Sequence, residues 1–99
     1  MNDSSQIIAY LTKNKHRLMR KYHLTKIGVF GSIARGDESD QSDIDLIVEF
    51  DDQVKDLYWI KEQLRAEINR QFKRPVDICR EKYIKPRIKN HILSHARYV

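Results

Sequence analysis

Apolar residues recur along this chain with two periods, about 3.6 and about 2 residues, which predict its helices and strands. A helical period follows the candidate N-caps Ser4 and Ser5 and predicts an amphipathic helix that ends before Thr25. The most regular helical period predicts a second helix from Val54 to Phe72. The apolar stripe of this helix consists of Leu57, Ile60, Leu64, Ile68 and Phe72. A last helix is expected to begin near Pro86, since proline suits a first helical turn.

Three β-rich segments lie between these helices and predict one small sheet. They are residues 25–32 (TKIGVFGS), 43–50 (DIDLIVEF) and 74–80 (RPVDICR). Alternation in the second segment predicts a core face with Ile44, Leu46, Val48 and Phe50, and an opposite face with Asp43, Asp45 and Glu49. The third segment is expected to turn Val76 and Ile78 one way, and Asp77 and Cys79 the other. The predicted order of elements is therefore α-β-β-α-β-α.

The composition is that of one small domain with a heavily charged surface. The chain has 99 residues, 40% hydrophobic and 33% charged, so residues 1–99 are expected to form a single domain. Its one cysteine, Cys79, excludes an intramolecular disulfide, and no apolar run approaches the ~18 residues of a membrane span. With no signal-like N-terminal stretch, these features predict a protein of the reducing cytoplasm with no membrane association.

Charge is strongly segregated along the chain. Residues 37–52 contain eight acidic side chains and no lysine or arginine, a formal charge of −8, whereas the remainder has 19 basic against six acidic side chains, or +13. An acidic metal-attracting pocket within a basic surround that draws in polyphosphate or an anionic partner would have this distribution. A solvated acidic loop opposite lysine-rich helices would have it too, and charge alone favours this second interpretation.

The acidic strand has the chemistry of a divalent metal site. Asp43 and Asp45 stand at i and i+2, so their carboxylates share one face and repel each other unless a hard cation binds them. If Asp77 of the later strand joins them, three carboxylates could hold two Mg²⁺ ions for phosphoryl transfer. Upstream, Gly31 lets a phosphate approach the backbone, and Ser32 can donate a hydroxyl to it. Each fragment alone is common, but the whole pattern is long and specific.

The stretch GSIARGDESDQSDIDLIV resembles the signature of the polymerase β nucleotidyltransferase superfamily, and most closely that of its minimal nucleotidyltransferase branch. The matching elements are Gly31-Ser32, Ala34-Arg35-Gly36, Ser42-Asp43-Ile44-Asp45-Leu46, Val76-Asp77 and the tail IKPRIKNHILSHARYV, in which Arg97 replaces the usual aliphatic residue. The resemblance covers roughly residues 26–99. It implies an α/β (α+β) fold of the polymerase β type, in which helices pack a small mixed sheet of three or more strands.

The resemblance also implies a function, the Mg²⁺-dependent transfer of AMP from ATP, with two Mg²⁺ ions. Similar proteins are antitoxins that adenylylate a tyrosine of a HEPN-domain ribonuclease toxin, so a HEPN toxin is the implied partner. The residues that match the family's roles are Gly31 and Ser32 for the triphosphate, Asp43 and Asp45 for the metal ions, and Asp77 for the metal ion that activates the incoming hydroxyl. Arg35 either neutralises the departing pyrophosphate or forms a surface ion pair.

Two other functions compete with this enzyme. One is a non-enzymatic antitoxin that inhibits the toxin by binding and occlusion, and the other is a basic nucleic-acid-binding module. Three intact carboxylates favour the enzyme, because a pure binder has no physical reason to keep side chains that repel one another. Direct nucleic-acid binding is disfavoured, since the sequence has no helix-turn-helix, RNA-recognition or zinc-finger pattern.

Some neighbouring residues are given plainer roles. Glu49 lies further along the acidic face and is expected to be a supporting or surface residue, while Cys79 is expected to be a small buried thiol. Aromatic residues partly off the core stripes could equally form a partner surface or fill the core. They are Tyr58, Trp59, Tyr83 and Tyr98.

Overall fold

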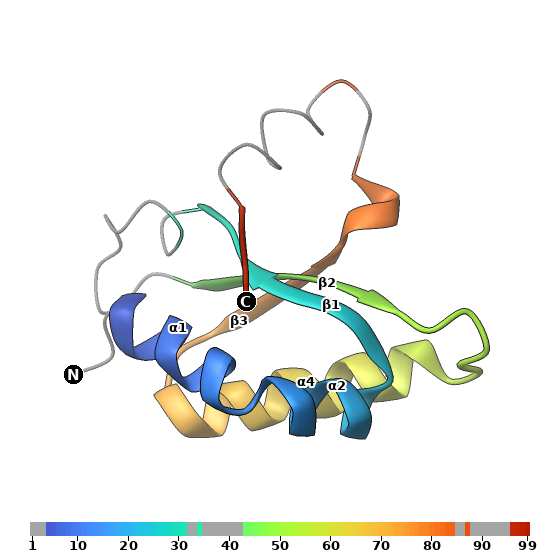
Figure 1. Ribbon diagram of the computed structural model, residues 1–99, viewed down its shortest axis with the longest axis horizontal. Coiled ribbons are helices and arrows are strands. Elements are labelled where there is room, and N and C mark those ends of the chain that lie inside the picture. The colour runs from blue at the N-terminus through green and yellow to red at the C-terminus, as the bar shows by residue number, and fades with distance from the viewer. Residues whose placement is uncertain (1–3, 32–33, 35–42, 85–86, 88–95) are drawn as a thin grey trace.

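The computed structural model has a layer of helices packed against one face of a mixed sheet (Figure 1). It describes residues 4–31, 34, 43–84, 87 and 96–99. The helices are α1 (Ser4–Lys13), α2 (Lys15–Tyr22) and α4 (Leu57–Phe72), with a short 3₁₀ helix, η1 (Glu81–Tyr83). The strands are β1 (Leu24–Val29), β2 (Ile44–Phe50), β3 (Val76–Arg80) and β4 (Arg97–Tyr98). None of the described helices is both long and apolar enough to cross a membrane.

The described strands lie in the order β3-β2-β1-β4, and one neighbouring pair among them is parallel. β1 runs antiparallel to both β2 and β4, whereas β2 and β3 are parallel. A parallel pair needs a long crossover connection. Helix α4, which follows β2 and precedes β3 in the chain, supplies it by running back along one face of the sheet (Figure 1). This mixed sheet with helices on one face confirms the predicted fold class.

The core lies between the sheet and the helices and uses the predicted alternation. The four side chains of β2 predicted to face inward are all buried: Ile44, Leu46, Val48 and Phe50. They pack with the predicted inward residues of β3 and α4, which are Val76, Ile78, Leu64, Ile68 and Phe72. The predicted faces of both strands are therefore confirmed, although α4 begins at Leu57 rather than Val54.

The predicted first helix is divided into two helices. Asn14 separates them with a non-helical backbone (φ −102°, ψ 11°). Both its backbone N–H and its side-chain amide donate to the Tyr10 carbonyl, at 3.0 and 2.9 Å. Asparagine side chains offer the backbone an alternative to helical hydrogen bonding, so the prediction of one continuous helix is wrong at this residue.

The C-terminal tail adds a strand that the sequence did not predict. Most of the predicted last helix, residues 88–95, lies outside the described residues, and after it β4 pairs with β1, with Tyr98 opposite Gly28. A Cβ at Gly28 would lie 2.5 Å from the carbonyl oxygen of Arg97, so glycine allows the tail to approach. The Tyr98 hydroxyl also donates to the Glu81 carboxylate at 2.8 Å. The tail is therefore bound to β1 by strand pairing and to η1 by a side-chain hydrogen bond.

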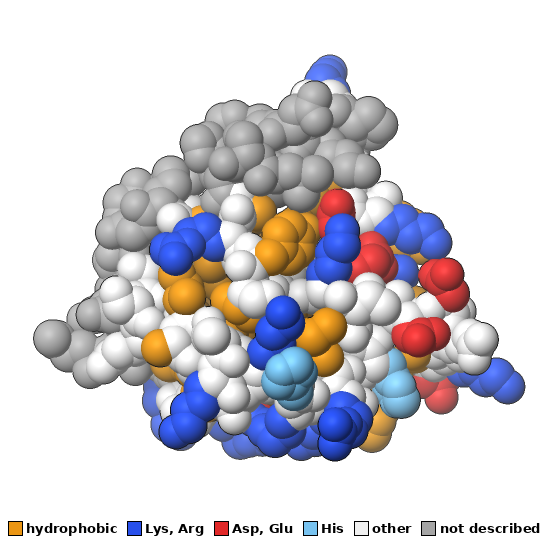
Figure 2. Space-filling model, viewed as in Figure 1, with side chains coloured by type: hydrophobic (Ala, Val, Ile, Leu, Met, Phe, Trp, Pro, Cys, Tyr) orange, Lys and Arg blue, Asp and Glu red, His pale blue; other side chains and the backbone are white. Residues whose placement is uncertain are grey.

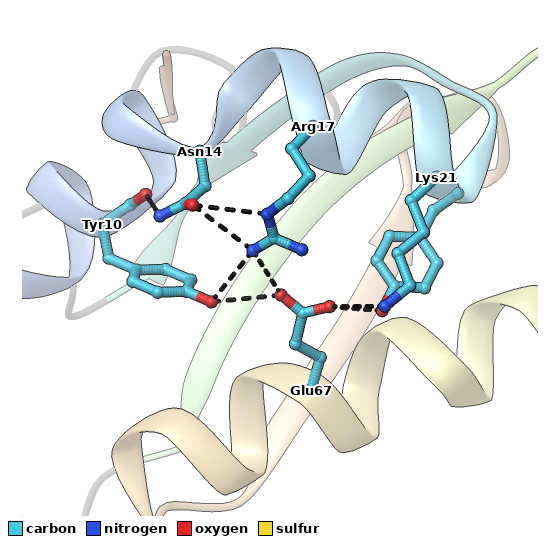
Figure 3. A network of polar contacts seen from close by, with 6 residues as sticks. Tyr10, Asn14, Arg17, Lys21 and Glu67 are labelled. Atoms are coloured by element: carbon cyan, nitrogen blue, oxygen red, sulfur yellow. Dashed lines mark hydrogen bonds and ion pairs between the residues drawn. The ribbon is translucent and has the colours of Figure 1, made fainter.

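A single carboxylate on α4 ties α1 and α2 to the crossover helix (Figure 3). Glu67 accepts hydrogen bonds from the Tyr10 hydroxyl at 3.1 Å, Arg17 Nη2 at 2.8 Å and the Tyr22 hydroxyl at 2.5 Å. Lys21 Nζ adds an ion pair at 3.4 Å. Burial opposes ionisation of Glu67, but the hydrogen bonds outweigh burial and lower its pKa to about 2.

Replacing Glu67 by glutamine should destabilise the fold by ~1–3 kcal/mol at neutral pH, because charge-assisted hydrogen bonds are lost at a largely buried position. The folded-state pKa of about 2 lies below the ordinary value of 4.5. The ionised carboxylate therefore stabilises the fold above pH 4.5, and this contribution is lost as the pH falls towards 2. The difference in Tm between wild type and Glu67→Gln should shrink as acid is added, which thermal unfolding at a series of pH values measures.

Glu62→Gln is the matched control for this variant. Glu62 lies on the same helix and pairs with Arg65 in a more exposed position. Its replacement should cost less than ~0.5 kcal/mol and show little dependence on pH. Equal losses of stability in the two variants would contradict the role assigned to Glu67.

Candidate active site

Parallel pairing of β2 with β3 brings two of the predicted site residues together. Asp45 and Asp77 are register partners in adjacent strands, which lie roughly 4.8 Å apart in a sheet. Each aspartate alternates with core residues, so both side chains project from the sheet face opposite the helices. Two carboxylates of like charge are therefore held side by side.

Gly31, just after β1, lies directly against Asp45, one member of this pair. Its φ of +66° falls in the left-handed region, which costs energy for residues with a side chain. A Cβ at this position would lie 2.6 Å from Oδ2 of Asp45, which is too close for any real contact. The preceding Phe30 donates its backbone N–H to the Asp45 carbonyl at 3.0 Å. The backbone of Gly31 and the carboxylate of Asp45 thus lie in direct contact. We call this point of contact the cradle, and a side chain at residue 31 would fill it.

The remaining predicted site residues are only partly described. Asp43 is exposed and immediately precedes β2, whereas Ser32 and Arg35 lie outside the described residues. Within residues 4–31, 34, 43–84, 87 and 96–99, no three His, Cys, Asp or Glu side chains form a cluster that could hold a metal ion. The described carboxylates follow the surface of the sheet and do not close a cage.

This donor set nevertheless fits Mg²⁺. Mg²⁺ prefers oxygen ligands and is commonly bound by one or two carboxylates together with substrate phosphates, without an all-protein cage. Asp45 and Asp77 supply such oxygens on adjacent strands, and the backbone of Gly31 lies against the Asp45 carboxylate. The arrangement is chemically suited to a metal-bound phosphate ester.

Glu49 and Cys79 occupy the same face without joining the pair. Glu49 accepts hydrogen bonds from Arg80 Nη2 at 2.7 Å and from the Lys82 backbone N–H at 2.9 Å. Burial opposes ionisation of Glu49, but these bonds hold its pKa below the ordinary value. Burial, and then the charge of Asp77, raise the pKa of the Cys79 thiol. Glu49 is thus a supporting residue, as predicted, and Cys79 is a half-buried thiol beside the carboxylates.

Basic residues near the carboxylates were not singled out by the sequence. Arg80 ends β3, and Lys61 of α4 lies near enough to Cys79 for its positive charge to offset part of the rise in the pKa of that thiol. Nothing in their local sequence distinguishes them from other basic residues, because their proximity depends on how α4 packs on β3. Figure 2 shows that Lys and Arg side chains also gather over the helical layer, at the lower edge of that view.

Comparison with known proteins assigns the chain to a family. A family model described as a nucleotidyltransferase domain matches residues 11–99, which include Gly31, Asp43, Asp45 and Asp77. The chain belongs to this nucleotidyltransferase family. The resemblance predicted from its motifs is therefore confirmed.

Relatives of this nucleotidyltransferase include proteins named for adenylyl transfer. It is 31% identical to the protein adenylyltransferase MntA of Thermococcus cleftensis over 96 residues, which cover 95% of this chain and 93% of that protein. It is 46% identical to a candidate protein adenylyltransferase of Methanocaldococcus jannaschii over 52 residues, or 52% of each chain. The chain matches only about half of the length of that relative and of two others from the same organism.

Solved structures share the fold of this nucleotidyltransferase. A candidate minimal nucleotidyltransferase superimposes with a TM-score of 0.79 at 26% identity, covering 96% of this chain and 94% of that one. A toxin–antitoxin protein crystallised with AMP-PNP has the same fold, with a TM-score of 0.67 at 19% identity over 87% of this chain and 69% of that one. The predicted minimal nucleotidyltransferase fold is thus confirmed.

Asp77→Asn should raise Tm by a few degrees in EDTA, because it removes repulsion between Asp77 and Asp45. MgCl₂ should stabilise the wild type more than the variant, since the variant keeps Asp43 and Asp45 but lacks the carboxylate opposite Asp45. Thermal unfolding in EDTA and in MgCl₂ measures both effects. Asp52→Asn, exposed in the β2–α4 connection, is the matched control and should show neither. A lower Tm for Asp77→Asn in EDTA would contradict repulsion within the pair.

Proposed function

We propose that this chain is an Mg²⁺-dependent antitoxin that transfers AMP from ATP to a tyrosine hydroxyl of a HEPN-domain ribonuclease toxin and so neutralises it in the cytoplasm. The observation that carries the proposal is the pairing of Asp45 with Asp77 beside the bare backbone of Gly31. The alignment of nearly the whole chain with a protein adenylyltransferase supports the reaction type. A toxin partner is supported by the fold shared with a toxin–antitoxin protein that was crystallised with AMP-PNP.

The nucleotide half of the proposed site begins at the end of β1. Gly31 is proposed to let the triphosphate approach the backbone closely, since glycine has no side chain to keep a phosphate away. Ser32, the next residue, is proposed to donate its hydroxyl to a phosphate oxygen. Arg35 is proposed to neutralise the pyrophosphate as it departs.

The metal half uses the carboxylates. Asp43 and Asp45 are proposed to hold Mg²⁺ with the triphosphate, and Asp77 to hold the ion nearest the acceptor. When bound, Mg²⁺ neutralises phosphate charge and lowers the pKa of a coordinated hydroxyl. Asp77 is exposed, so an acceptor side chain of another protein can reach it from solvent.

The proposed reaction is a single displacement at the α-phosphorus of ATP. The acceptor oxygen forms a bond to the α-phosphorus while the bond from that phosphorus to the bridging oxygen of the β-phosphate breaks. Pyrophosphate leaves with the electron pair, and the hydroxyl proton passes to solvent beside Asp77. The products are a phosphodiester on the acceptor and free pyrophosphate.

Inhibition by occlusion is the second candidate function, because side chains suited to a protein interface are exposed. Tyr58 is 79% exposed, Trp59 63% and Tyr83 67%, so these three do not fill the core. Aromatic residues are enriched at protein interfaces. In this alternative the chain would bind and block its toxin without transferring AMP.

Gly31→Ala should weaken the Mg²⁺-dependent binding of ATP by roughly tenfold or more, since the methyl group meets Asp45 and the left-handed backbone becomes strained. Isothermal titration calorimetry with ATP and MgCl₂ measures the affinity, and EDTA should abolish binding by the wild type. Lys55→Ala, exposed in the β2–α4 connection, is the control and should bind ATP normally. Unchanged affinity in Gly31→Ala would refute the placement of phosphate at the cradle.

Asp77→Asn should still bind ATP and the toxin but lose AMP transfer, because only the activation of the acceptor hydroxyl is removed. Mass spectrometry of the cognate HEPN ribonuclease, after incubation with ATP and MgCl₂, would detect each added AMP. Asp52→Asn is the matched control and should transfer AMP as the wild type does.

The same variant separates the two antitoxin models. If Asp77→Asn binds the toxin but no longer neutralises it, the covalent modification is the mechanism. If it neutralises the toxin at one-to-one stoichiometry, occlusion is sufficient. Full transfer by Asp77→Asn would show that the role of this carboxylate is wrongly assigned.

A further inference from the structure

The outer edge of β3 carries backbone groups that no described strand covers. β3 stands at the end of the strand order, beside β2. The backbone carbonyl of Pro75, just before β3, accepts a hydrogen bond from the Ile44 N–H of β2 at 2.8 Å. In a parallel ladder every second residue directs its backbone groups to the same neighbouring strand, so Asp77, like Pro75, directs its groups towards β2. The alternate residues of β3 must then direct theirs outward. Consistent with this direction, the Val76 carbonyl accepts a hydrogen bond from Arg65 Nε at 3.1 Å.

The other outward groups belong to Ile78 and Arg80, which border a groove between β3 and α4. A hollow of 390 Å³ lies there, lined on the α4 side by Tyr58 and Lys61. A second hollow of 370 Å³ lies further along the same strand at Val76. We call the two hollows the β3 trough. The five residues of β3 extend for roughly 17 Å, enough to pair with a short extended segment.

The β3 trough combines exposed aromatic rings with positive charge. Tyr58 and Tyr83 line it and are 79% and 67% exposed. The guanidinium of Arg80 lies 4.8 Å from the Tyr83 ring centroid and is held by Glu49. Lys61 also lines the trough, so an acidic side chain would find a complementary charge there.

We propose that the edge of β3 left uncovered by the described strands binds an extended, acidic segment of the partner protein as an added strand, and so presents the acceptor hydroxyl beside Asp77. The inference rests on the proposed function, to which it adds how the acceptor is recognised. Backbone hydrogen bonds to Ile78 and Arg80 would provide affinity, and the aromatic rings and Lys61 would select side chains.

The geometry of a sheet explains why this edge suits the chemistry. Paired residues in neighbouring strands turn their side chains to the same face, as Asp45 and Asp77 do. A residue of the added strand opposite Asp77 would continue that row at the next strand position, roughly 4.8 Å further on. Its hydroxyl would then lie beside the Asp77 carboxylate, and the register of the added strand would decide which residue is modified.

A test needs a probe of defined composition. We suggest a synthetic peptide that alternates glutamate with valine around one central tyrosine, since it is acidic, extended and carries a hydroxyl. Two control peptides replace glutamate by lysine, or place proline on both sides of the tyrosine. Calorimetry measures binding to the whole chain, and amide hydrogen exchange by NMR reports on Ile78 and Arg80.

The wild type should bind the acidic peptide more tightly than either control, and exchange of the Ile78 and Arg80 amides should slow by roughly tenfold or more. Tyr58→Ala should weaken binding roughly tenfold, the usual effect of losing an interface aromatic. Trp59→Ala is the matched control, because Trp59 is the next residue of α4 but lines a different hollow. Lys61→Glu should reverse the preference between the acidic and basic peptides.

Three results would overturn the inference: no slowing of exchange at Ile78 and Arg80, equal effects of Tyr58→Ala and Trp59→Ala, or slowing that appears without peptide as the protein is concentrated. The last result would assign the edge to a second copy of this chain. If AMP is transferred to the toxin or the peptide while the Ile78 and Arg80 amides stay unprotected, the proposed function stands and the docking is rejected. If these amides are protected but neither the toxin nor the peptide receives AMP, the docking stands and the proposed function is rejected.

Discussion

The parallel pairing of β2 with β3 shapes both the core and the candidate site of this protein. It places Asp45 beside Asp77 at a spacing where two negative charges repel. Because parallel strands cannot be joined by a tight turn, the same pairing requires α4 as a crossover. The crossover buries one face of the sheet, and the carboxylates occupy the other. Core and site are thus two consequences of one pairing.

The fold treats its acidic residues in two ways. Glu49, Glu67 and Glu81 each accept hydrogen bonds from neighbouring basic or hydroxyl groups and hold elements together. Asp77, in contrast, is exposed beside another carboxylate. A residue that only stabilised the fold would gain more from a basic partner than from a neighbour of like charge. The proposed function accounts for this repulsion, since a bound cation would offset it.

Glycine acts twice in this chain as a point of close approach. Gly28 lets the tail strand β4 pair with β1, and Gly31 lets backbone meet the Asp45 carboxylate. The first closes one edge of the sheet, while β3 at the other end of the described strand order keeps outward backbone groups. Under the proposed function such an edge is useful, because backbone pairing can position an acceptor without a deep pocket.

Local periodicity determined a large part of this protein. Alternation in residues 43–50 predicts which side chains of β2 are buried, and the helical stripe predicts the packing face of α4, because each depends only on neighbours along the chain. The motif around Gly31 and Asp45 likewise indicates the family, since its residue types and spacing are local features of the chain. Tertiary structure alone decided the register of Asp45 with Asp77, the contacts that gather at Glu67 and the return of the tail as β4. These depend on pairings between residues far apart in sequence, whose free energy comes from packing and hydrogen bonds that no local pattern encodes.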